Sequence, residues 1–132
     1  MKKILRLIPI IIALVSFQTK AQEVSQMKLV MDIHDEVMAK MSTTVKLVHR
    51  LSGKTDSSEY ETAINDLKAS NKSMVVWMEG FGKRFDADEM MKGKQLTDQK
   101  KVWLNEEEVK VKALRDQINS SIERAETLLA KE

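Results

Sequence analysis

The chain of 132 residues contains no cysteine, and its single proline is Pro9. Without thiols it can form neither disulfides nor the thiolate sites that hold structural zinc and iron–sulfur clusters. After Pro9 the strongest helix breakers are four glycines, at positions 53, 80, 82 and 93. Aromatic residues make up only 5% of the chain, and no segment sustains the apolar–polar alternation that is typical of strands. These absences favour long helices that are held together by packing alone.

The first 21 residues have the pattern of a cleavable signal peptide. Three basic residues precede the apolar run Leu7–Phe17, and Ala21 is a small residue at the expected cleavage site. The run is shorter than the roughly 20 apolar residues that span a bilayer. We therefore expect residues 1–21 to be removed and the remainder to be exported, to the periplasm or outside the cell. An uncleaved N-terminal anchor is the alternative.

Removal of this segment changes the charge of the protein. Residues 22–132 hold 18 basic and 20 acidic residues, a net charge of −2, whereas the whole chain has +2. A nucleic-acid-binding protein needs a clustered basic face, so we expect no nucleic-acid partner. The remaining length corresponds to one domain, and we expect no membrane span within it.

Apolar residues recur every three or four positions in three segments, at about 23–52, 58–79 and 98–131. Gly53 is expected to end the first segment in a left-handed cap, and Ser58 with Glu61 to open the second as a capping box. Gly80 is expected to end the second segment. Because short loops place consecutive helices side by side, we predict an all-α fold, an up-down-up antiparallel three-helix bundle. The connector from about residue 80 to 97 has room for one or two helical turns.

The stretch MDIHDEVMAKM, residues 31–41, places a histidine among methionines. A tight turn between the first two helices brings His34 level with Met74 and Met78, and Trp103 is expected nearby. Thioether and imidazole groups suit Cu(I). The candidate soft-metal site consists of Met31, His34, Met38, Met74 and Met78.

The same residues also suit the core of a helical bundle, and we favour this interpretation. Methionine is an adaptable core residue, and Asn71 is close enough along the second helix to be a hydrogen-bond partner of His34. A haem held by His34 and a methionine would lack the CxxCH attachment motif. No set of residues resembles a catalytic triad, a paired-histidine metal motif or a phosphate-binding loop. We therefore expect no enzymatic activity and no cofactor, with copper as the alternative.

Two segments, HDEVMAKM at 34–41 and WMEGF at 77–81, resemble small exported bacterial helical proteins often labelled viral A-type inclusion protein. The chain departs from that pattern at Ala39, where a proline is expected, and in lacking a lipoprotein cysteine. The resemblance implies an exported helical protein with no catalytic residues that can be transferred to this chain. It also implies that one group of residues acts together: His34, Met38, Met41, Trp77, Met78 and Phe81.

The sequence thus predicts an exported, non-enzymatic helical module that binds an unknown protein partner or associates with the cell envelope. The alternative is a periplasmic copper-binding protein. Self-association is a further expectation, because the apolar residues from Ile118 to Leu129 should extend beyond the shorter second helix.

Overall fold

The computed structural model describes residues 19–54 and 57–131. Within these ranges the chain forms four helices and no strand. The helices are α1 (Lys20–Ser52), α2 (Ser58–Arg84), α3 (Ala87–Met91) and α4 (Asp98–Ala130). The all-α prediction is confirmed, and the connector contains a short helix in addition to the three long ones. Residues 1–18 of the expected signal peptide lie outside the described residues, and Ala21 lies in the first turn of α1.

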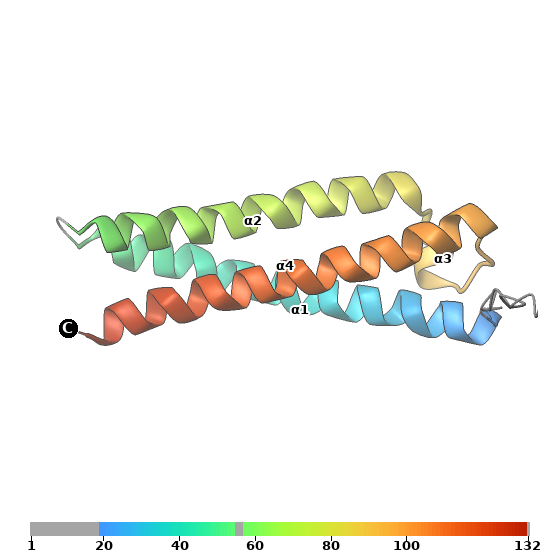
Figure 1. The fold of residues 1–132 in the computed structure, drawn as a ribbon, viewed down its shortest axis with the longest axis horizontal. Helices are drawn as coiled ribbons and strands as arrows, with labels where there is room; N and C mark the ends of the chain where they lie inside the picture. The colour runs from blue at the N-terminus through green and yellow to red at the C-terminus, as the bar shows by residue number, and fades with distance from the viewer. Residues whose placement is uncertain (1–18, 55–56, 132) are drawn as a thin grey trace, which may run out of the picture.

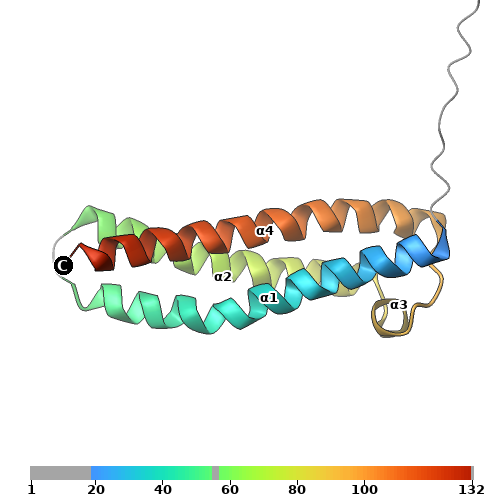
Figure 2. The same cartoon turned by 90° about the horizontal axis from the view of Figure 1, so that it is seen from below.

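The three long helices lie side by side and give the molecule the shape of a rod (Figure 1). Each of them packs against the other two. Helices α1 and α4 begin at the same end of the rod, and α2 runs in the opposite direction (Figures 1 and 2). The short α3 packs against α1 near the start of α1 and α4. We call this end of the rod the α3 end, and the other the C-terminal end.

Several helix boundaries differ from the predictions because local capping decides them. Thr19 and Gln22 form a capping box that starts α1 at Lys20 rather than at about residue 23. Ser57, not Ser58, caps α2, so the predicted capping box of Ser58 was wrong. Gly53 has a φ of −79°, so the predicted left-handed cap was also wrong. The glycine with positive φ is Gly93, at 67°, in the connector.

Helix α2 continues through Gly80 and Gly82 to Arg84, so its predicted end at residue 79 was wrong. The rings of Trp77, Phe81 and Phe85 follow one another with 4.9 Å between neighbouring centroids. Both phenylalanines are buried. This burial offsets the roughly 1 kcal/mol by which each helical glycine is less favourable than alanine. The helix therefore ends where the aromatic row ends.

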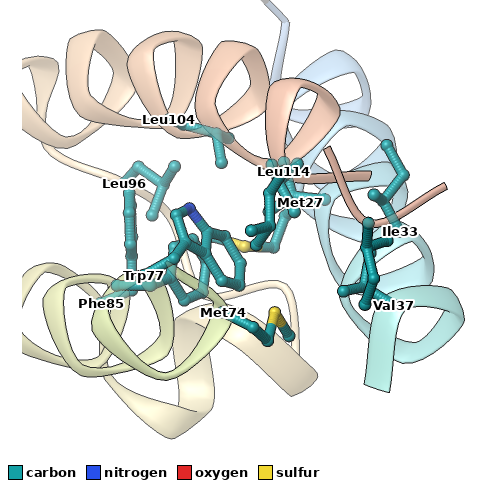
Figure 3. Packing of buried hydrophobic residues seen from close by; sticks show 13 residues of the cluster. Met27, Ile33, Val37, Met74, Trp77, Phe85, Leu96, Leu104 and Leu114 are labelled. Carbon is teal, nitrogen blue, oxygen red and sulfur yellow. The ribbon is translucent and has the colours of Figure 1, made fainter. Parts of the chain in front are cut away.

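The core consists of two clusters. The methionine–aromatic cluster begins at the α3 end and combines methionine and aromatic residues with aliphatic ones: Met27, Val30, Ile33, Val37, Met74, Trp77, Phe81, Phe85, Leu96, Leu104, Val111, Leu114 and Ile118. Figure 3 shows Trp77 packed there with Met27, Met74 and Leu96. The aliphatic cluster occupies the C-terminal end and consists of Leu47, Leu51, Ala63, Leu67, Ala125, Leu128 and Leu129.

A polar layer separates the two clusters along all three long helices. The hydroxyl oxygens of Ser70 and Ser121 lie 2.8 Å apart. The hydroxyl of Thr44 lies 2.7 Å from the side-chain oxygen of Asn71. Thr44, Ser70 and Ser121 are all buried. These hydrogen bonds satisfy hydroxyl groups that would otherwise be costly to bury.

The apolar surface that was expected to drive self-association is not exposed. Ile118 and Ala125 have 0% exposure, and Leu128 and Leu129 have 8%. Residues from the end of α1 and the start of α2 share the aliphatic cluster with the last turns of α4, so the chain itself covers them. Within the described ranges, none of the helices combines the length and apolarity needed to cross a membrane.

Candidate functional site

The five residues of the sequence-predicted metal site lie at different depths. Met74 is fully buried, whereas Met38 and Met78 are 39% and 38% exposed. Met31 is partly buried and packs against the methionine–aromatic cluster. The set therefore extends from the centre of the bundle to its surface.

His34 lies at the expected level of the bundle. Its ring centroid is 6.0 Å from that of Trp77, which lies between Met74 and Met78 in the sequence. The hydrogen-bond partner differs from the prediction: His34 Nδ1 is 2.8 Å from Asp35 Oδ1. Asn71 instead accepts a hydrogen bond from Thr44, which lies almost three turns after His34 along α1. The pairing through Nδ1 leaves Nε2 as the ring nitrogen that can meet another ligand.

A pocket of about 380 Å³ opens at the α3 end, between α1 and the segment that contains α3. We call it the methionine pocket, because methionine side chains come to it from both elements. Its apolar lining consists of Val24, Met27, Met31, Met90, Met91 and Leu96. The volume lies within the range of ligand-binding pockets, roughly 300–1,000 Å³.

Four carboxylates also line the methionine pocket: Glu23, Asp32, Asp35 and Glu89. Each of them already has a basic partner. The pairs are Glu23–Lys101 at 3.1 Å, Asp32–Lys28 at 2.6 Å, Asp35–His34 at 2.8 Å and Glu89–Lys100 at 2.5 Å. Among the side chains that line the pocket, the uncharged donor groups are the thioether sulfurs of the four methionines and the amide of Gln95.

The short helix α3 is held in place by hydrogen bonds at its first residues. Asp86 caps α3 and forms a capping box with Glu89. Lys94 Nζ is 3.0 Å from an Asp86 carboxylate oxygen. The backbone N–H of Glu89, and then Lys94, lower the pKa of Asp86 to about 2. The wall of the pocket that carries Met90 and Met91 is thus an ordered turn rather than an open loop.

Gly93 lets the chain pass close to α1 after α3. Its φ of 67° lies in the left-handed region, where glycine has no steric penalty. A Cβ atom at this position would lie 3.4 Å from a methyl group of Val24. The turn at Gly93 therefore brings the connector against the edge of the methionine pocket.

A buried glutamate of α4 links α4 to the end of α2 through an ion pair. Glu107 is buried on α4 and accepts a hydrogen bond of 3.0 Å from Arg84, the last residue of α2. The Arg84 guanidinium also lies over the ring of Trp103, 5.1 Å from its centroid. Trp103 packs against the methionine–aromatic cluster together with Met74 and Trp77, which confirms the expected gathering of these residues.

A second, more open groove of about 720 Å³ lies between α2 and α4. Small residues such as Ala69, Ser73 and Ala113 line it, with Trp77 among them. Trp77 Nε1 is buried and finds no hydrogen-bond partner among the described residues. The groove joins the surface to the same cluster that forms the floor of the methionine pocket.

The sequence analysis did not include four residues that line the methionine pocket: Glu23, Glu89, Met90 and Met91. One signal was present: Glu23 precedes Met27 by four residues and so lies on the buried stripe of α1. Met90 and Met91 gave no such signal, because their position depends on the path of the connector.

Among residues 19–54 and 57–131, no three histidine, aspartate or glutamate side chains are grouped as metal ligands. Comparison of the chain with known protein families, curated proteins and solved structures gives no significant match.

Proposed function

We propose that the protein is an exported, non-enzymatic helical binding module that acts in the periplasm or outside the cell, in association with a protein partner or the envelope. In this proposal its three long helices form an up-down-up antiparallel bundle after removal of a signal peptide. The methionine pocket is the observation that carries the proposal. The resemblance to exported helical proteins agrees with it and stays a prediction.

The chemistry of the pocket favours a small apolar group as the bound feature. Methionine side chains are unbranched and polarisable, so they adapt to apolar groups of different shape. Three lysines line the pocket beside the four carboxylates, so the positive and negative charges of the lining nearly cancel and little net charge remains to attract an ionic headgroup. We infer that the pocket receives an apolar side chain of a partner protein.

Binding of the apolar fluorescent probe N-phenyl-1-naphthylamine tests this function. Val24 lines the pocket and is 44% exposed, so Val24→Trp fills the pocket without disturbing the core. Val109 is 69% exposed on α4 and does not line the pocket, so Val109→Trp is the matched control. We expect saturable binding to the wild type and to Val109→Trp, and loss of binding in Val24→Trp. Equal binding by both variants, or none by the wild type, would contradict the proposal.

A copper-binding function at Met31, His34, Met38, Met74 and Met78 is the second candidate. The contact between Asp35 and His34 Nδ1 favours it, because metal-bound histidines commonly engage a carboxylate through the other ring nitrogen. If these residues bind Cu(I), His34→Ala should weaken the binding measured against a competing chelator. An unchanged Cu(I) affinity in this variant would exclude His34 as a ligand.

A further inference from the structure

We propose that the methionine pocket is a site for a soft monovalent cation, Cu(I) or Ag(I), with Met31, Met90 and Met91 as its ligands. The inference rests on the proposed function only in taking this pocket as the binding site. It differs from the sequence-predicted copper site, with which it shares Met31 alone.

The position of the sulfur-containing side chains is the first support. Met27 and Met31 come from successive turns of α1, and Met90 and Met91 are neighbours in α3. All four line the same pocket. Two separate elements therefore supply thioethers to one space, which is the arrangement that a metal site between them requires.

The second support is that the carboxylates of the pocket, which are its other possible metal ligands, already have partners. Every carboxylate of the pocket is paired with a lysine or with His34, so a hard cation such as Ca²⁺ would have to displace these partners. Neutral thioethers have no such partners, and they select soft ions such as Cu(I). The chain has no cysteine, so no thiolate competes for the ion.

The exposure of the methionines assigns their roles. Met91 is 75% exposed, and Met31 and Met90 are partly buried, so all three can turn toward an ion without opening the core. Met27 is only 4% exposed and forms the apolar floor. By contrast, Met74 of the sequence-predicted set is fully buried, and the core would have to open for its sulfur to bind an ion.

Convergence of the three sulfurs depends on rotation of the methionine side chains. The pocket, at about 380 Å³, is much larger than a single ion. Helix α3 has five residues, packs against α1 alone among the helices, and is tied to α4 by the Glu89–Lys100 pair. These contacts hold α3 in place, so the three rotatable bonds of each methionine side chain bring the sulfurs toward a common ion.

Competition with the chelator bicinchoninate, under anaerobic reducing conditions, measures the affinity of the protein for Cu(I). The test variant carries Met31→Leu, Met90→Leu and Met91→Leu, which remove the sulfurs but keep apolar side chains of similar volume. The control carries Met38→Leu and Met78→Leu, two partly exposed methionines outside the pocket. We expect the test variant to lose more than about tenfold in affinity, and the control to bind like the wild type.

Each outcome decides the proposal. Loss of Cu(I) affinity in the control but not in the test variant would overturn it in favour of the sequence-predicted set, and no Cu(I) binding by the wild type would overturn it outright. If the triple variant does not fold, Met91→Leu alone makes the same test with a smaller loss, because Met91 is largely exposed. The triple variant should still bind N-phenyl-1-naphthylamine, since leucine keeps the pocket apolar. If the wild type binds the probe but not Cu(I), the metal inference is rejected and the proposed function still stands.

Discussion

The two ends of the rod are built from the same three long helices but have different interiors. The aliphatic cluster at the C-terminal end contains only leucine and alanine among its buried residues. The α3 end has methionine and aromatic side chains in addition to aliphatic ones, together with three buried glutamates and the methionine pocket. Close-packed aliphatic side chains resist rearrangement, whereas methionines and a short helix permit it. This difference supports the proposal that the α3 end is the binding end, whereas the C-terminal end stabilises the bundle.

The largest expected difference between the ends is in the free energy of unfolding. It compares a truncated leucine in the aliphatic cluster with a methionine replaced by leucine in the methionine–aromatic cluster. Leu67 and Met74 are both fully buried on α2, one in each cluster. Leu67→Ala should lower the free energy of unfolding by about 2–5 kcal/mol, because it leaves a cavity. Met74→Leu should lower it by less than about 1.5 kcal/mol, because volume is kept and the cluster adapts. Urea unfolding measures both, and a larger effect of Met74→Leu would contradict the assignment of the scaffold to the C-terminal end.

The next effect concerns the ion pairs of the α3 end. Arg84→Met removes the hydrogen bond from Arg84 to the Glu107 carboxylate, whose side chain is 3% exposed. We expect a loss of about 1–3 kcal/mol in the free energy of unfolding, because Lys110 is then the one remaining charged partner of the buried carboxylate within the described part of the chain. The neighbouring Lys83→Met breaks only the exposed pair with Glu79 and should cost less than about 1 kcal/mol. Equal losses in the two variants would show that burial of Glu107 does not matter.

A smaller effect is expected in the polar layer that separates the two ends. Ser70→Ala or Ser121→Ala alone should each lower the free energy of unfolding by about 1 kcal/mol, because the hydroxyls are partners at 2.8 Å. The double variant should lose less than the sum of the two, since the loss of either hydroxyl already removes the hydrogen bond between them. Strictly additive losses in a double-mutant cycle would mean that the two hydroxyls do not interact.

The smallest effect is local to α3 and depends on pH. The pKa of Asp86 is lowered from 3.8 to about 2 in the folded chain. Its carboxylate therefore stabilises the start of α3 fully at pH values above its ordinary pKa, and this contribution is lost as the pH falls from 3.8 toward about 2. Amide hydrogen exchange or NMR signals of α3 should show the helix loosening over this interval. Asp86→Asn should remove the pH dependence, and its persistence in that variant would assign it to another group.

The sequence predicted the long helices because each buries one stripe of residues at spacings of three and four. On α1, fully buried residues follow one another at intervals of seven, as this periodicity requires: Val30, Val37, Thr44 and Leu51. The end of α2 was predicted too early, at Gly80. The low helix propensity of glycine is outweighed there by the burial of Phe81 and Phe85. The methionine pocket could not be foreseen, because Met90 and Met91 meet Met31 only through the path of a connector that has no periodic pattern.

The most direct test of the binding end is the NMR spectrum of the chain with ¹³C-labelled methionine methyl groups, recorded during titration with N-phenyl-1-naphthylamine. Methionines report from the pocket (Met31, Met90, Met91) and from outside it (Met38, Met78), so the protein carries its own internal control. We predict that the methyl signals of Met31, Met90 and Met91 shift in a saturable manner while those of Met38 and Met78 stay unchanged. Shifts confined to Met38 and Met78, or unchanged signals throughout, would contradict the assignment of binding to the α3 end.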